Sequence, residues 1–155
     1  MDGHQPSAYY KELQVAWPLF VITIPLQFII TYLYWNDLGD RPLSHFGFGM
    51  ATVVFILIYL TFYGMTTKIT NDSILVTFGI GFVRKRIAIK RIKNLEVVKT
   101  PWYYGYGIRY IPEGTLYNIS GNSAVELNLN DSEKVIRIGT KDAAKLKHEI
   151  AVRKI

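Results

Sequence analysis

The fold is decided by two apolar stretches: VAWPLFVITIPLQFIITYLYW, residues Val15 to Trp35, and FGFGMATVVFILIYLTFYGM, residues Phe46 to Met65. As helices they would each be about 30 Å long, which matches the hydrocarbon core of a bilayer. Neither stretch contains a charged residue or shows a polar stripe, and a helix that is apolar on every side needs lipid or a large protein core around it. The rest of this 155-residue chain is too short to supply such a core, so the sequence predicts two membrane-spanning helices.

Aromatic residues mark both ends of the first stretch, as expected where rings settle among lipid headgroups. They are Tyr9, Tyr10 and Trp17 at one end, and Tyr32, Tyr34 and Trp35 at the other. The alternative is a cleaved signal peptide, which needs a basic N-terminal region, a shorter apolar stretch and small residues at the cleavage site. Lys11 is the single base ahead of the stretch, so we expect a retained helix that follows a tail of residues 1–14.

Charge is distributed unevenly along the chain. Residues 1–65 carry a net charge of −2 and residues 66–155 one of +8, which together give the total of +6. The short turn between the two stretches, Asn36 to His45, contains one base and two acids. Because bases close to membrane spans tend to stay in the cytoplasm, we expect the C-terminal domain and both termini there, with the turn outside.

After the second stretch the apolar residues change to a period of two, which is typical of strands. Seven short strands are predicted, at residues 66–70, 74–78, 86–90, 95–97, 116–120, 124–129 and 134–138. From about residue 141 the pattern is helical, with Thr140 or Asp142 able to cap the start. The residues that share one face of this helix are Ala143, Leu146 and Ile150. This order predicts an α+β protein in which a seven-stranded antiparallel split barrel is closed at one end by the helix.

The stretch TPWYYGYGIRYIPEGTLYNISGNSAVEL, from Thr100 to Leu127, and the later IRIGT before the last helix resemble the bacterial PH-like (pleckstrin-homology-like) domain family. The resemblance covers about Thr66 to Arg153. It implies a PH-like domain at residues 66–155 behind two transmembrane helices, in the bacterial cytoplasmic (inner) membrane. For function it implies only a platform for binding and assembly, because folds of this kind serve many roles.

The densest charge in the chain is a run of bases between residues 84 and 93. It consists of Arg84, Lys85, Arg86, Lys90, Arg91 and Lys93. Its closeness to the second apolar stretch suits contact with anionic lipid headgroups, where each exposed base gains about 1 kcal/mol. The alternative is a solvated strand face whose lysines discourage aggregation between sheet edges. Nucleic acid is not expected as a partner, because no recognition motif accompanies the bases.

Aromatic residues crowd the loop between Thr100 and Thr115. They are Trp102, Tyr103, Tyr104, Tyr106 and Tyr110, and Arg109 lies among them. An exposed patch of this kind would mark contact with a partner protein or with the membrane. The sequence favours the alternative that the loop is partly buried over the mouth of the barrel.

No set of catalytic, cofactor-binding or metal-binding residues stands out, and the chain has no cysteine. Its three histidines, His4, His45 and His148, are scattered and have no partners at metal-ligand spacing. We therefore expect a non-enzymatic, membrane-anchored binding module without a cofactor. It would help to assemble or stabilise a membrane complex, with another membrane protein or as a homo-oligomer, in contact with membrane lipids. The alternatives are a sensor of anionic lipid headgroups and an uncharacterised enzyme.

Overall fold

The computed structural model describes residues 10–40 and 42–154. The first half of the chain contains β1 Tyr10–Val15, α1 Trp17–Trp35, α2 His45–Phe62, β2 Gly64–Ile69, β3 Ser73–Phe78 and β4 Val83–Ala88. The second half contains the 3₁₀ turn η1 Ile89–Arg91, β5 Ile92–Lys99, the 3₁₀ turn η2 Trp102–Tyr104, β6 Gly107–Ile111, β7 Gly114–Asn118, β8 Ser123–Leu129, β9 Ser132–Gly139 and α3 Ala143–Ala151. The predicted α+β class is confirmed: two long apolar helices are followed by mostly antiparallel sheets and a C-terminal helix.

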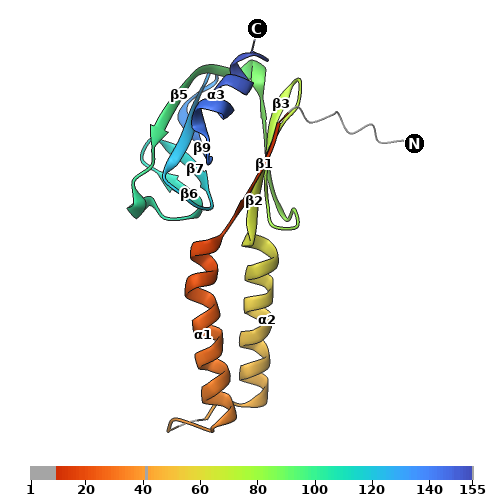
Figure 1. The fold of residues 1–155 in the computed structure, drawn as a ribbon, viewed down its shortest axis with the longest axis vertical. Helices are drawn as coiled ribbons and strands as arrows, with labels where there is room; N and C mark the ends of the chain where they lie inside the picture. The colour runs from red at the N-terminus through yellow and green to blue at the C-terminus, as the bar shows by residue number, and fades with distance from the viewer. Residues whose placement is uncertain (1–9, 41, 155) are drawn as a thin grey trace, which may run out of the picture.

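The helices α1 and α2 form a hairpin that projects away from the sheets (Figure 1). Both are long and apolar enough to cross a membrane, and no residue of either helix is buried. The two helices touch through aromatic rings: Tyr34 stacks on Phe48 with centroids 4.2 Å apart, and Phe20 stacks on Tyr59 at 5.6 Å. The hairpin therefore presents an apolar surface to its surroundings.

Four strands form one antiparallel sheet in the order β1-β2-β3-β4. The helical hairpin is inserted between β1 and β2, which are nevertheless direct neighbours, with Val15 paired to Gly64. Single residues, Ala16 and Tyr63, separate these strands from the helices, and the Ala16 N–H donates to the Tyr63 carbonyl at 2.9 Å. The two strands therefore continue directly into the two helices (Figure 1).

The strand β1 is the main difference from the sequence-based expectation, which placed residues 1–14 in a tail. Residues 10–15 form a strand because β2 pairs with their backbone groups. Side chains hold β1 as well, since Gln14 is fully buried and its amide nitrogen donates to the Gly139 carbonyl at 2.8 Å. The second helix also stops before residue 65, because β2 begins at Gly64. The folded domain is thus built from chain on both sides of the hairpin.

The other five strands form a sheet in the order β5-β8-β9-β7-β6. Two differences from the sequence-based expectation lie here. The pair β7 and β9 is parallel, and β6 forms inside the stretch expected to be a loop, where it pairs with β7. At Gly114 the backbones of β7 and β9 come so close that a Cβ atom would lie 1.9 Å from the Val135 carbonyl oxygen. Only glycine allows this parallel contact.

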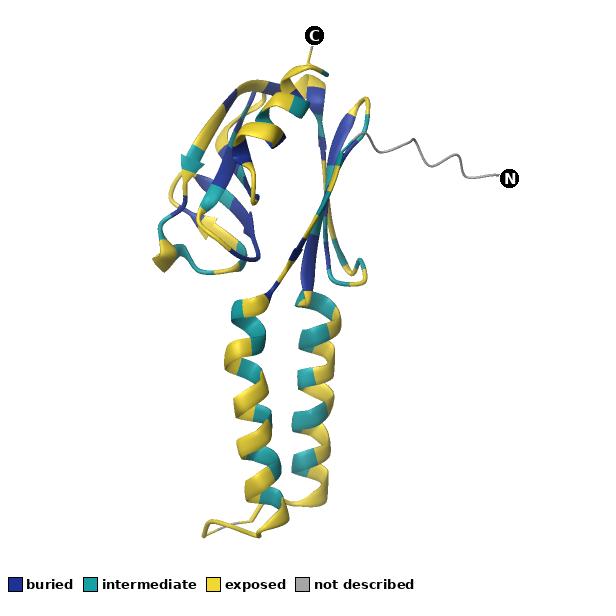
Figure 2. Ribbon diagram, viewed as in Figure 1, coloured by how far each residue is buried: buried dark blue, intermediate teal, exposed yellow. Residues whose placement is uncertain are grey.

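The core lies between the inner faces of the two sheets, with α3 against it at the end away from the helices (Figures 1 and 2). The predicted face of the last helix, Ala143, Leu146 and Ile150, is confirmed as buried, and the buried residues of β3, β4 and η1 include Ile74, Val76, Phe78, Ile87 and Ile89. Asp142 caps α3 by accepting a hydrogen bond from the Lys145 N–H at 2.9 Å. The domain therefore has a hairpin-proximal end, where the helices begin, and a hairpin-distal end, where α3 lies.

Candidate functional site

The six bases between residues 84 and 93 do not form one surface. Arg84 lies close to the hairpin-proximal end of β4, because its neighbour Val83 pairs with Phe78 at the end of β3. Lys90 and Arg91 lie in η1, beyond the opposite end of β4. The chain turns there from the four-stranded sheet into the five-stranded sheet, so the run is divided between the two ends of the domain.

The turn between β3 and β4 contacts the end of α2. The Ile80 N–H donates to the Leu60 carbonyl at 3.1 Å. Gly79 has a φ of +53°, and a Cβ atom there would lie 2.2 Å from the same carbonyl oxygen, so a side chain would not fit. Ile80 and Phe82 are 54% and 68% exposed. The turn therefore holds two exposed apolar side chains beside the hairpin, with Arg84 just after them.

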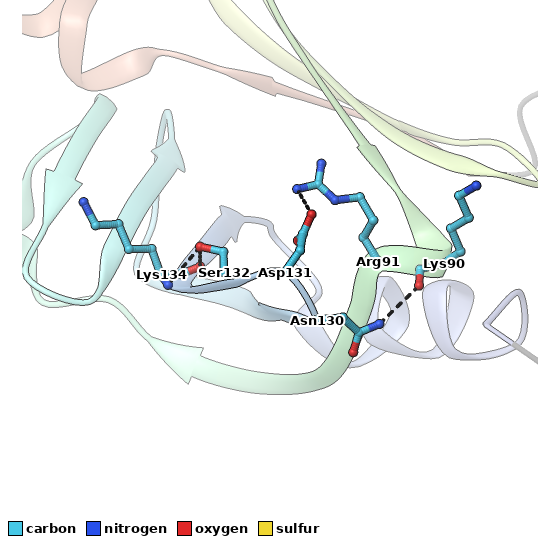
Figure 3. Close-up of polar contacts among 6 residues, drawn as sticks. All are labelled: Lys90, Arg91, Asn130, Asp131, Ser132 and Lys134. Atoms are coloured by element: carbon cyan, nitrogen blue, oxygen red, sulfur yellow. Dashed lines mark hydrogen bonds and ion pairs between the residues drawn. The ribbon is translucent and has the colours of Figure 1, made fainter.

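At the distal end, Lys90 and Arg91 of η1 contact the turn between β8 and β9 (Figure 3). The Arg91 guanidinium lies 2.5 Å from the Asp131 carboxylate, and the Asn130 amide nitrogen donates to the Lys90 carbonyl at 3.4 Å. These contacts attach the β8–β9 turn to η1. For Arg91 they indicate a structural role.

Four bases gather on the outside of the four-stranded sheet, a surface that we call the outer basic face: Lys11 of β1, Lys68 of β2, and Arg84 and Arg86 of β4. Lys11 pairs directly with Lys68, and Leu75 connects Lys68 to Arg86 in the same row across the sheet. Like charges directly opposite each other destabilise a sheet. No Asp or Glu stands among the strand residues of this face, and within the described residues none of the four bases is in an ion pair.

The sequence-based prediction found only part of this face. It included Lys85, which pairs with buried Val76 and therefore points to the other side of the sheet. It omitted Lys68, although Thr67 and Ile69 are buried on either side of it and the alternation could have shown that it points outward. Lys11 could not be found, because its segment was expected to be a tail.

The aromatic loop is mostly exposed, which contradicts the expected burial over the barrel mouth. The exposed fractions are 85% for Trp102, 67% for Tyr103 and 91% for Tyr110, and Tyr106 is 39% exposed. Tyr104 is half-buried. Part of the stretch forms β6 at the edge of the five-stranded sheet, where Ile108 packs against the core while Tyr110, on the same side of the strand, extends beyond it and stays exposed.

A groove of about 530 Å³ runs between the aromatic loop and the start of the helices. One wall consists of Ala16, Pro18, Leu19, Ile22 and Phe62, and the other of Gly105 to Arg109 with Ile119. Arg109 is exposed, its Nε donates to the Tyr106 carbonyl at 3.0 Å, and within the described residues it is in no ion pair. The groove thus brings the aromatic loop and one free base to the hairpin-proximal end.

A half-buried carboxylate, that of Glu12, joins β1 to the start of the last helix. Glu12 accepts hydrogen bonds from the Tyr10 hydroxyl at 2.6 Å, the Thr140 hydroxyl at 2.6 Å and the Lys141 N–H at 2.8 Å. Burial, and then the hydrogen bond to Glu12, raises the pKa of the Tyr10 hydroxyl well above its ordinary value. This cluster explains how a strand from the far side of the hairpin stays in the domain.

Residues 10–40 and 42–154 contain no group of three or more His, Asp or Glu side chains that could hold a metal ion. His45 accepts or donates a hydrogen bond with the Tyr34 hydroxyl at 2.9 Å, far along the chain from His148 on α3. His4 lies outside the described residues. The absence of an enzymatic or metal function therefore stays a prediction.

Comparison with protein-family profiles, with curated protein sequences and with solved structures finds no match to this chain. The function is therefore argued from the surfaces described above.

Proposed function

We propose that this chain is a two-span protein of the bacterial cytoplasmic membrane and that its PH-like domain lies on the cytoplasmic side. The exposure of α1 and α2 supports the crossing, because burying apolar surface in lipid gains about 25 cal/mol per Å² and neither helix finds that burial within the chain. Two sheets around one core with a C-terminal helix support a PH-like domain, while the parallel pair β7–β9 departs from the all-antiparallel barrel that the sequence predicted. Lys68, Arg84, Lys85 and Arg86 follow the second helix closely, whereas the turn between the helices contains only one base, and this bias favours the cytoplasmic side.

On this anchor, the domain acts as a non-enzymatic binding module that helps to assemble or stabilise a membrane protein complex, with another membrane protein or with a second copy. One observation carries the proposal: Trp102, Tyr103 and Tyr110 are exposed on one loop, by 85%, 67% and 91%. Large rigid aromatic side chains concentrate binding energy in protein interfaces. Aromatic rings of this size that stay exposed together indicate a contact surface.

The attachment of the domain to the helices supports the same proposal. Only Ala16 and Tyr63 separate the strands from the helices. These short connections limit the distance and orientation of the domain relative to the helical hairpin. The aromatic loop lies beside the hairpin, since Gly105–Arg109 and the start of α1 line the same groove. A neighbouring membrane protein would therefore meet the loop and the helices together.

The test is the size of the full-length protein's complex, extracted from its native membrane in mild detergent. Trp102→Ala combined with Tyr103→Ala should reduce the size of the complex without lowering the melting temperature, because neither ring is buried. Phe82→Ala is the matched control, since Phe82 is also an exposed aromatic residue at the hairpin-proximal end but lies on the other sheet. An unchanged complex in the double variant would contradict the proposal.

Binding of anionic lipid is a second candidate, and Arg109 is the observation that favours it. This base has no acidic partner among the described residues and lines a groove with the apolar side chains Leu19 and Ile22. Such a groove could take an acyl chain along α1 and a phosphate at the guanidinium. Arg109→Gln should then lower the amount of anionic lipid that copurifies, whereas Arg91→Gln at the distal end should not.

Orientation is tested separately. Cysteines introduced at Asn36, in the turn between the helices, and at Asn130, in the domain, should react differently with an impermeant thiol reagent in intact cells. Labelling at Asn36 alone is expected. Labelling at Asn130 alone would place the domain on the outer side of the membrane.

A further inference from the structure

We infer that the outer basic face, formed by Lys11, Lys68, Arg84 and Arg86, binds an acidic segment of a partner protein. This surface lies on the four-stranded sheet, whereas the aromatic loop belongs to the five-stranded sheet. The inference therefore does not depend on the role proposed for the loop.

The arrangement of charge is the first argument. Lys11 and Lys68 are directly opposite on neighbouring strands, where adjacent backbones are about 4.8 Å apart, and repulsion between them weakens the sheet. Arg86 stands in the same row, and no acidic residue of these strands points to the same side. A carboxylate from another molecule, placed over this row, would remove the repulsion and gain several attractive contacts at once.

The orientation of the face argues against a flat lipid surface as its partner. The strands continue in the direction of the helices, so the face stands along the hairpin axis rather than across it (Figure 1). Lys68 is four residues beyond Gly64, which places it about 13 Å along the strand from the end of α2. This distance exceeds the Debye length of about 8 Å at physiological ionic strength, so attraction to headgroups is largely screened at the row of Lys11, Lys68 and Arg86, whereas Arg84, level with Thr66, lies nearer the hairpin.

Apolar side chains on the same face argue for a protein and against nucleic acid. Leu13 and Val15 are 50% and 48% exposed and follow Lys11 on the same face of β1. Leu75 lies between Lys68 and Arg86. A segment that presents acidic and apolar side chains on the same face would match both features, whereas a polyphosphate backbone would leave the leucines and the valine uncovered.

The test uses the full-length protein in mild detergent and a short labelled peptide of the repeat Glu-Glu-Val-Val, which when extended places both Glu and Val on each face. Binding should weaken as salt rises, and the double variant Lys11→Gln and Lys68→Gln should bind about tenfold more weakly at low salt, because two surface charge contacts are lost. The matched control is Lys93→Gln with Lys134→Gln, two exposed lysines of the five-stranded sheet, which should bind as the wild type does. The melting temperature gives a second readout, because removal of the like-charge pair should leave the double variant at least as stable as the wild type.

Three results would overturn the inference. The double variant and the control could bind the peptide equally, which would show that the face is not the site. The peptide of the same length with Gln in place of every Glu could bind as tightly as the acidic one, which would show that the contact is apolar. A single-stranded oligonucleotide or anionic vesicles could displace the acidic peptide from the wild type at equal charge, which would assign the face to a polyanion or to lipid.

Discussion

On the five-stranded sheet, Arg137 lies between two carboxylates, 2.7 Å from Glu126 and 3.8 Å from Glu113, whereas on the four-stranded sheet Lys11 stands directly opposite Lys68. The side chains of Arg137 and Glu126 are only 13% and 14% exposed, so their attraction acts within the fold. The bases of the outer face are solvent-accessible, and among the residues that the structure describes none of them is in an ion pair. The basic surplus of the domain therefore does not mark one function: some bases hold strands together, and others remain available to a partner.

The two sheets differ also in how they are attached. The helical hairpin leaves from the four-stranded sheet between β1 and β2, and the five-stranded sheet has no direct continuation into it. If the hairpin is an insertion into an ordinary strand-to-strand turn, residues 16–63 can be replaced by Asn-Gly. Val15 and Gly64 are directly paired, which is the spacing that a two-residue turn joins.

The largest expected effect comes from this replacement and its counterpart. The chain with Asn-Gly in place of residues 16–63 should fold as a water-soluble domain with a cooperative thermal transition. A fragment that begins at Gly64 should not, because it lacks β1, buried Gln14 and the Glu12 contacts, and a domain's whole stability is about 5–15 kcal/mol. Circular dichroism melting of the two proteins would decide, and equal melting temperatures would show that β1 is dispensable.

The next effect tests the contrast between a base in a salt bridge, Arg137, and a base outside the described salt bridges, Arg84. Arg137→Gln should lower the free energy of unfolding by about 2–3 kcal/mol, because it leaves the half-buried Glu126 carboxylate without its partner. Arg84→Gln on the outer basic face should change it by less than about 0.5 kcal/mol. Denaturant unfolding of both variants provides the measurement, and similar losses would break the distinction between the sheets.

A pH effect tests how β1 is fastened. Burial and the hydrogen bond to Glu12 raise the pKa of Tyr10 above its ordinary value of 10, so the folded state holds this proton more tightly than the unfolded chain does. Stability should be at its full level below pH 10 and should fall as the pH rises through that value. Tyr10→Phe should flatten this fall in plots of melting temperature against pH. A weaker fall should remain, because burial also raises the pKa of Tyr117.

The smallest effect has the opposite sign. Lys68→Gln should raise the free energy of unfolding by about 0.5 kcal/mol, since it removes one member of the like-charged pair. The gain should shrink at high salt, because screening already weakens the repulsion in the wild type. Lys134→Gln, on the other sheet, should show neither the gain nor its salt dependence. A loss of stability on Lys68→Gln would mean that this lysine makes a stabilising contact.

The elements with strong periodicity were predictable from the sequence. The apolar faces of β3 and α3 follow from a period of two and a period of 3.6, and Asp142 caps α3 as its position before the helix suggested. Both long helices follow from length and hydropathy alone. These features depend on neighbours in the chain, so a single sequence contains them.

The features that sequence reasoning missed depend on partners distant in the chain. β1 alternates in the wrong sense for a simple strand, because polar Glu12 and Gln14 point inward and apolar Leu13 points outward. That reversal makes sense only once Thr140 and Gly139, more than 120 residues later, are seen to receive those side chains. The parallel pairing of β7 with β9 likewise leaves no local signal besides Gly114. The outer basic face was found only in part: the alternation of β2 could have shown Lys68, but Lys11 depends on the pairing of β1 with β2.

The insertion of the hairpin between two adjacent strands has a consequence for biogenesis. During synthesis β1 emerges first, and its partner β2 appears only after both helices have been made. In a bilayer the two strands can pair only if α1 and α2 each cross the membrane, so that the chain returns to the side on which β1 lies. A chain in which one helix failed to insert would leave β1 and β2 on opposite sides, with the Glu12 carboxylate out of reach of Thr140. If the hairpin spans a membrane as proposed, completion of the sheet would therefore depend on correct insertion of both helices, and misinserted chains would be left with unpaired strands.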